Sequence, residues 1–233
     1  MNNKITKDFA KSIIEYNADS IIDIGETGID TFIDESLIKV IPVLKTLYGL
    51  AKTGFAIREN HMLSKTVRFI NYINSQKKDN EKFENYKKEL RGNNDKRLKE
   101  LERVLVIIDR YIDENKVDIL SNLFISYFEE KITWEDFIEL SIVIDNIFIK
   151  DINELKNIYI NNSITMNQII DSISFKRLKN QCLVDDAQSV RRHSNGSIGH
   201  YYNEYDYQIT DLGKKFYKYG VEGLNYGIKT KII

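Results

Sequence analysis

The chain has 233 residues, of which 42% are hydrophobic, and its 34 basic and 35 acidic side chains give a formal net charge of −1. This apolar content is enough to form a core, which excludes wholesale disorder, and the balanced charge argues against a protein whose whole surface binds nucleic acid. One proline and 11 glycines favour helices over a turn-rich β architecture.

A single cysteine, Cys182, rules out an intramolecular disulfide and a multi-cysteine zinc site, and it fits a reducing compartment. Its position between Leu178 and Leu183 predicts a packed thiol rather than a nucleophile. Near the N-terminus, Lys7 and Lys11 interrupt the continuous apolar core that a signal peptide requires. We therefore expect a cytoplasmic protein.

Residues 4–74 show a helical pattern in which charge is strongly segregated. Between residues 18 and 36 the carboxylates recur every three or four residues without any Lys or Arg, so a helix there would carry them on one stripe. These residues are Asp19, Asp23, Glu26, Asp30 and Asp34.

From Leu37 to Ile57 the chain is apolar except for Pro42 and three lysines. A lysine at the centre of a membrane span costs about 2.5–3.5 kcal/mol, so a permanent transmembrane helix is disfavoured. The pattern favours an amphipathic core helix that presents Lys45 and Lys52 to water. Two alternatives stay open for this segment. Together with the acidic segment before it, it could form a hairpin that lies on or enters a membrane, or it could bind a partner protein. The residues of this membrane or partner segment are Leu37, Leu44, Lys45, Leu47 and Lys52.

After a polar interval at 75–94, three amphipathic helices are predicted. The first has Asp95 as its N-cap, and the third begins after Thr133 with acidic residues in its first turn, where the helix dipole favours negative charge. Short connections between them indicate a helical bundle. We divide the chain into a helical domain, 1–160, and a C-terminal module, 164–233. The helical domain comprises N-terminal helices in 1–75 and the bundle in 95–160.

The C-terminal module is predicted to be winged-helix-like. Short helices are expected at Thr165–Asp171 and Phe175–Cys182, followed by two strands around the turn Ser194–Ser197, whose Asn-Gly pair supplies positive φ angles. Thr210 or Asp211 would cap a final helix. The fold class is therefore mainly α, a helical bundle followed by a small α+β module.

Basic residues gather where a winged helix would meet phosphate. Lys176, Arg177 and Lys179 lie on the second predicted helix, and Arg191 and Arg192 lie on the hairpin. Such cations bind nucleic acid by neutralising phosphates. Neighbouring carboxylates dilute this patch, so the same residues could instead serve packing or contact with a protein partner.

No catalytic or cofactor site emerges from the chain. His61, His193 and His200 form no H-x-x-x-H or H-E-x-x-H pattern, and the glycines form no nucleotide-binding loop. No serine lies in a nucleophile elbow. We therefore predict a protein without catalytic residues, cofactor or metal, and not an enzyme.

Two pairs of segments resemble known families. Residues 41–58 together with 131–144 are similar to uncharacterised helical proteins of bacterial and prophage genomes. Leu178–Val184 together with Tyr207–Phe216 resembles the C-terminal module of proteins of the abortive-infection alpha type. The resemblance implies a role in phage–host conflict, and it brings no active-site residue with it.

We accordingly expect a non-enzymatic protein of phage defence or prophage exclusion, which acts through protein or membrane interaction. The C-terminal module would sense a partner, and the segment Leu37–Ile57 would deliver the effect. The alternatives are a winged-helix DNA-binding regulator and a phage-encoded inhibitor that occludes a host protein. The expected partner is a protein, with a membrane surface or nucleic acid as the other options, and the location is cytoplasmic or peripheral to the membrane.

Overall fold

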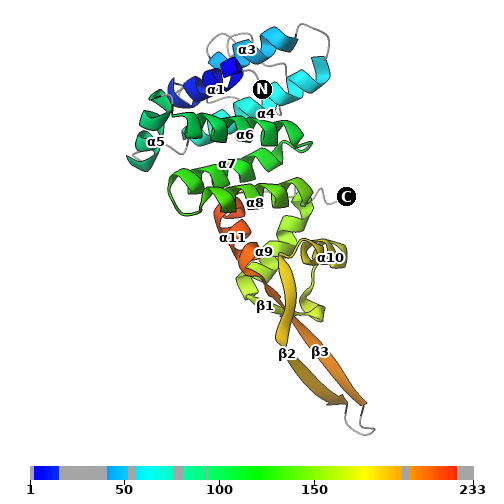
Figure 1. Ribbon diagram of the computed structural model, residues 1–233. Helices are drawn as coiled ribbons and strands as arrows, with labels where there is room; N and C mark the ends of the chain where they lie inside the picture. The colour runs from blue at the N-terminus through cyan, green and yellow to red at the C-terminus, as the bar shows by residue number, and fades with distance from the viewer. Residues whose placement is uncertain are drawn as a thin grey trace. The chain divides into compact units, whose positions relative to one another are not determined.

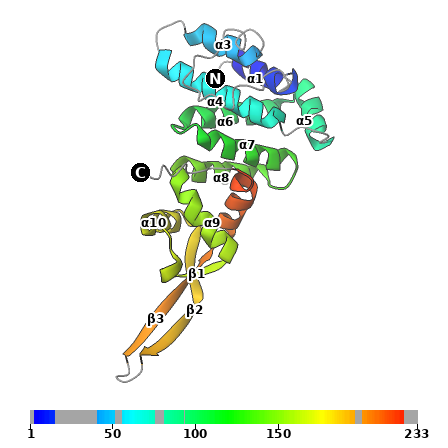
Figure 2. The same ribbon diagram turned by 180° about the vertical axis from the view of Figure 1, so that it is seen from behind.

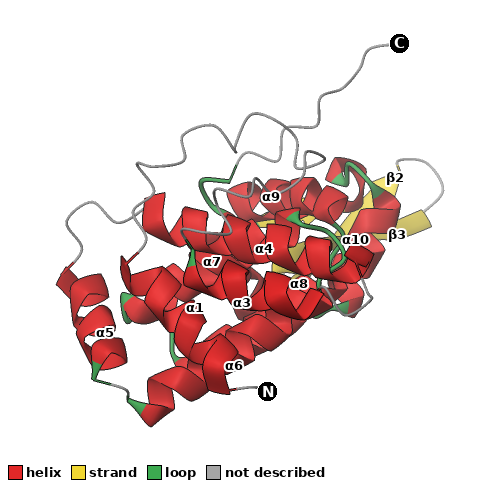
Figure 3. Cartoon of the chain, turned by 90° about the horizontal axis from the view of Figure 1, so that it is seen from above, coloured by secondary structure: helices red, strands yellow, loops and turns green. Residues whose placement is uncertain are grey.

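The computed structural model describes residues 3–15, 41–51, 56–75, 81–92, 94–195 and 200–224. These residues are mainly helical with one three-stranded antiparallel sheet, which confirms the predicted fold class (Figures 1 and 3). The chain forms two compact units, Met1–Trp134 and Glu135–Ile233. The domain boundary that we predicted near residue 160 falls within the second unit. The predicted acidic stripe at 19–34 lies outside the described residues.

Six described helices belong to the first unit. They are α1 (Asn3–Glu15), α3 (Pro42–Ala51), α4 (Ala56–Ser75), α5 (Glu81–Arg91), α6 (Asp95–Arg110) and α7 (Asn115–Phe128). Aromatic rings fill much of the core between them, as in the contact of Phe69 with Phe124, whose centroids lie 5.5 Å apart. These helices bear out the predicted bundle-like packing.

Helix α3 is fixed to α1 by polar contacts at its N-terminal end. The Ser12 hydroxyl accepts a hydrogen bond from the Val43 backbone N–H at 3.1 Å, and Thr46 donates to the Asp8 carboxylate at 2.6 Å. Ser12 thereby satisfies an N–H that the first helical turn leaves free, while Pro42 has no N–H to satisfy. Helix α3 is therefore part of the first unit's core.

A buried lysine closes the C-terminal end of α6. Lys65 of α4 is almost fully buried, and its ammonium donates to the backbone carbonyls of Asp109 at 3.0 Å and Tyr111 at 2.6 Å. Carbonyls at a helix C-terminus lack partners within the helix and carry partial negative charge. A single cation thus satisfies two of these acceptors and ties α4 to α6.

The second unit contains most of α8 (Trp134–Asn146) and a compact α+β module. Its further elements are η2 (Ile149–Asp151), α9 (Ile152–Asn161), β1 (Ser163–Thr165), η3 (Met166–Gln168), α10 (Ser172–Asn180), β2 (Val184–Asn195), β3 (His200–Ile209), α11 (Asp211–Phe216) and a π-helical turn (Tyr217–Val221). The order of the sheet is β1-β3-β2, and all its pairs are antiparallel. This module is α+β, as predicted, and the order α10, β2, β3 and α11 matches the helix, hairpin and helix expected for it.

The helix predicted over Thr165–Asp171 is wrong. Ser163–Thr165 instead pairs with β3, and a single 3-10 turn follows. The Gln168 side chain accepts a hydrogen bond from the Thr165 backbone N–H at 2.8 Å, which closes the turn back on itself. Ile164 is buried while Ser163 is exposed, so this segment has the alternating burial of a strand.

Strands β2 and β3 form a hairpin that extends well beyond β1, as Figures 1 and 2 show. Its register is continuous from Val190↔Tyr205 to Asn195↔His200, with an irregularity between Asp186 and Val190. The turn predicted at Ser194–Ser197 begins too early: Ser194 and Asn195 still belong to β2, opposite Tyr201 and His200, and residues 196–199 between the strands lie outside the described residues.

The start of α11 is locked to the start of β2. Thr210 caps α11 by accepting from the Gly213 N–H at 3.0 Å, and its hydroxyl donates to the Cys182 carbonyl at 2.7 Å. Gly213 has no side chain to obstruct this approach, since a Cβ there would lie 2.2 Å from the Leu183 carbonyl oxygen. The Thr210-to-Gly213 motif therefore has a folding role.

Candidate functional site

Local capping interactions fix both ends of helix α10. The Asp171 side chain accepts hydrogen bonds from the N–H groups of Ile173 and Ser174 and so forms the N-cap. At the other end Cys182 has a φ of 58°, and the Leu183 N–H donates to the Leu178 carbonyl at 3.0 Å. This is a Schellman ending. It leaves Cys182 exposed, so the predicted packed thiol is wrong.

Arg177, one of the predicted binding residues, forms an ion pair inside the unit. Its Nε donates to the Asp151 carboxylate at 2.8 Å, a second nitrogen donates to the other carboxylate oxygen, and its guanidinium lies 4.8 Å from the Phe148 ring centroid. The hydrogen bonds with Asp151 raise the pKa of Arg177. Asp151 is fully buried, and a buried carboxylate requires such a partner. The role of Arg177 in this structure is therefore to hold α10 against η2.

Lys179 is also paired. Its ammonium donates to the Asp186 carboxylate at 2.6 Å and lies 5.5 Å from the centroid of the Tyr207 ring. The hydrogen bond with Asp186 raises the pKa of Lys179. Lys176, by contrast, is exposed on the outer face of α10. Of the three predicted cations on this helix, two are neutralised by carboxylates of their own unit.

The structure places Arg191 and Arg192 on β2, in the part of the hairpin beyond β1. In the register of the sheet Arg191 stands opposite Glu204, and Arg192 stands opposite Asn203. The two arginines thus lie on the hairpin, as predicted, and the other three basic residues lie on α10.

Several large apolar side chains in or near α10 are exposed. Four large side chains in or next to η2, η3 and α10 are between 56% and 72% exposed, namely Phe148, Met166, Ile170 and Ile173. We call this set the α10 apolar surface. Monomeric proteins expose single apolar side chains freely, but grouped ones mark interaction sites. Sequence reasoning missed it because Ile170 and Ile173 have the spacing of a buried helix face.

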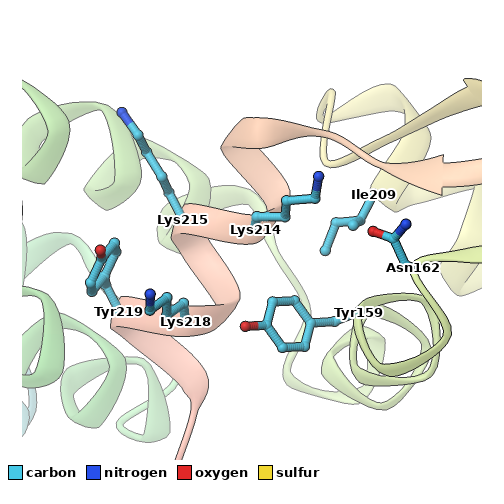
Figure 4. A pocket seen from close by; sticks show the side chains of 7 residues that line it. All are labelled: Tyr159, Asn162, Ile209, Lys214, Lys215, Lys218 and Tyr219. Atoms are coloured by element: carbon cyan, nitrogen blue, oxygen red, sulfur yellow. The ribbon is translucent and has the colours of Figure 1, made fainter.

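A pocket of about 500 Å³ lies on another part of the second unit (Figure 4). Its lining residues come from the end of α9, the end of β3 and the helical segment that starts with α11. They are Tyr159, Asn162, Ile209, Lys214, Lys215, Lys218 and Tyr219. Sequence reasoning did not single out these residues. The only signal was the pair Lys214 and Lys218, which stand four residues apart.

The residues predicted for a membrane or partner segment differ in how deeply they are buried. Leu44 is fully buried, Leu47 is half-buried and Lys45 is exposed, while the side chains of Leu37 and Lys52 lie outside the described residues. Within the described ranges, no helix has both the length and the apolar character needed to cross a membrane.

The described residues contain no group of three or more His, Cys, Asp or Glu side chains that could hold a metal ion. His61 lies in a structural contact, with its Nε2 2.9 Å from the Ile112 carbonyl oxygen and its Nδ1 3.1 Å from the Glu114 carboxylate.

Comparison of the chain with family models, curated proteins and solved structures found no match.

Proposed function

We propose that this chain is a non-enzymatic binding protein whose second unit docks a protein partner through the α10 apolar surface. The proposal rests on the contrast between the paired cations of α10 and the exposed apolar side chains in and beside this helix. Its arginine and one of its lysines pair with internal carboxylates, while Ile173 and the adjacent Ile170 face solvent. A helix that read DNA would present polar and cationic groups there.

Burying these side chains against a partner is favourable. Each large aliphatic side chain that becomes fully buried contributes about 1.5–3 kcal/mol, and apolar anchors at the centre of an interface supply most of its binding energy. Lys176 lies on the same exposed face of α10, three residues beyond Ile173, and would stand at the rim. A partner with an apolar pocket and an acidic margin fits this surface.

The proposed setting is phage–host conflict, in defence, in prophage exclusion or as an inhibitor that occludes a host protein. Its support is the resemblance of Leu178–Val184 and Tyr207–Phe216 to the abortive-infection alpha type. Of the two routes of action, protein contact is favoured over membrane contact. Leu44 is fully buried, so α3 would have to leave the core before it could insert into a bilayer.

The test is affinity capture from bacterial lysate with three forms of the full chain. We expect the natural chain to retain one partner in stoichiometric amount, and Ile170→Ser with Ile173→Ser to lose it. The matched control is Ile160→Ser, which alters another exposed isoleucine of the same unit, on α9. Equal recovery by the double variant and the control would overturn the proposal.

Nucleic acid is the second candidate, because the hairpin carries Arg191 and Arg192 on the part of β2 that extends beyond β1. This function predicts binding to a DNA duplex that weakens steeply with salt. Replacing both arginines with glutamine should reduce the affinity and the salt dependence together. Binding that is absent, or that does not respond to salt, would remove this candidate.

A further inference from the structure

The pocket beside α11 is lined by three lysines. Lys214 and Lys218 stand four residues apart on one helical segment, where like charges disfavour the helix by a few tenths of a kcal/mol. Both side chains are exposed, and the described residues that line the pocket include no carboxylate. Lys214 forms an ion pair with the exposed Asp211 three residues earlier, with 3.8 Å between the charged atoms.

The third lysine of the pocket is neutralised. Lys215 donates to the Asp136 carboxylate at 2.7 Å, which raises the pKa of Lys215. Figure 4 shows its side chain directed away from the other two lysines. The ammonium groups left for a ligand are those of Lys218, which lies 5.4 Å from the centroid of the Tyr219 ring, and of Lys214, whose ion pair is longer than that of Lys215.

The pocket also has an aromatic wall. Tyr159 stacks on Tyr217 with ring centroids 4.3 Å apart and an angle of 29° between the planes. Tyr159 is half-buried and lines the pocket, and Tyr217 behind it is buried, so the stack is held from within the unit. A flat ring that enters the pocket could extend this stack, and base–aromatic stacking is favourable for every base.

A polar group completes the lining. Asn162 ends α9 with a φ of 59°, a left-handed conformation that asparagine tolerates better than most residues. Its amide offers both donors and an acceptor at the mouth of the pocket. In Figure 4 the Lys214 side chain extends toward Asn162 and Ile209, and Tyr159 lies below them.

We propose that this pocket binds a nucleotide. The phosphate groups would contact the ammonium groups of Lys214 and Lys218, and the base would stack on Tyr159. A volume of about 500 Å³ is within the range of small-molecule sites. The bound nucleotide is either a free mononucleotide or one residue of a single-stranded nucleic acid, which share this chemistry.

The experiment is calorimetric titration of the full chain with ADP, with inorganic pyrophosphate and with a ten-nucleotide oligothymidylate. We expect one saturable site, and replacing both Lys214 and Lys218 with glutamine should weaken binding at least tenfold. The matched control is Lys150→Gln, an exposed lysine of η2 that is not among the residues lining the pocket. Its affinity should stay within twofold of the natural chain.

The variant Tyr159→Leu tests the contact with the base separately from the contacts with the phosphates. It should weaken ADP binding at least fivefold and leave pyrophosphate binding within twofold, while circular dichroism confirms that the fold is retained. ADP binding without competition by the oligothymidylate would identify a free nucleotide, and tighter binding of the oligothymidylate at the same lysines would identify a single strand. Absence of saturable binding by all three probes, or equal weakening by the control, overturns the proposal.

Discussion

Replacing Gly213 with alanine should destabilise the second unit strongly. The added Cβ would lie 2.2 Å from the Leu183 carbonyl oxygen and 2.8 Å from Cγ1 of Ile209. A backbone oxygen cannot swing aside as a flexible side chain can, so α11 and the start of β2 must separate. The separation stretches the hydrogen bonds from Thr210 to the Cys182 and Leu183 carbonyls, which measure 2.7 Å and 3.0 Å.

The expected magnitude follows from these contacts. Two lost hydrogen bonds cost about 2 kcal/mol, and overpacking adds about 2 kcal/mol. The better helix propensity of alanine returns about 1 kcal/mol, so the net loss is about 3 kcal/mol. For a urea dependence of about 2 kcal/mol per molar, the unfolding midpoint should fall by about 1.5 M.

The assay is urea unfolding followed by hydrogen exchange, which assigns the loss to particular amides. The only tryptophan, Trp134, stands at the boundary of the two units, so fluorescence alone would not assign the loss to the second unit. The control is Gly49→Ala in α3, where nothing lies within 4 Å of the added Cβ and a gain of about 0.5–1 kcal/mol is expected. If Gly213→Ala shifted the midpoint no more than this control, the close approach of Gly213 to Leu183 would not limit stability.

Three further outcomes are expected. Lys65→Met removes the donor to two backbone carbonyls at the end of α6, so the free energy of unfolding in urea should fall by about 3 kcal/mol. A fall of less than about 1 kcal/mol would contradict the capping role of Lys65. Burial, and then the hydrogen bond with Glu100, raise the pKa of Tyr127, so the unfolded state ionises first and stability falls as pH rises above 10.0. Tyr127→Phe should flatten that fall in a pH series of unfolding midpoints. Leu44→Asp should cost more than about 3 kcal/mol by the same urea assay, and Lys45→Asp at the exposed neighbouring position less than about 0.5 kcal/mol; similar losses would contradict the packing of α3.

The elements that could be predicted from the sequence have strong local signals. Helix α8 begins directly after Thr133 as expected, and Thr210 caps α11. The first bundle helix begins one residue from the prediction, because Asn94 rather than Asp95 accepts from the N–H groups of the first turn. Caps and periodicity involve residues within a few positions of each other, so a single sequence contains them.

The features that could not be predicted depend on partners far along the chain. Asp151 lies 26 residues from Arg177, and nothing local indicates that a buried carboxylate would take that guanidinium. Ser163–Thr165 becomes a strand only because β3 offers a free edge. Tyr159 and Lys214 share a pocket only after α9 and α11 have packed together.

The cations of the second unit therefore have two different roles, which their number in the sequence does not separate. Arg177 and Lys179 sit where a winged helix would place cations for DNA, and each is paired with a carboxylate of the same unit. The described residues that line the pocket of Lys214 and Lys218 include no carboxylate, and the ion pair of Lys214 with Asp211 is longer, at 3.8 Å. An ammonium that already donates to a carboxylate gains little from a phosphate, because the first ion pair must break. The exposed lysines of the pocket lie on the segment that begins with α11, on the other side of α9 from α10 in Figures 1 and 2, so the proposed partner surface and the proposed nucleotide pocket are separate sites.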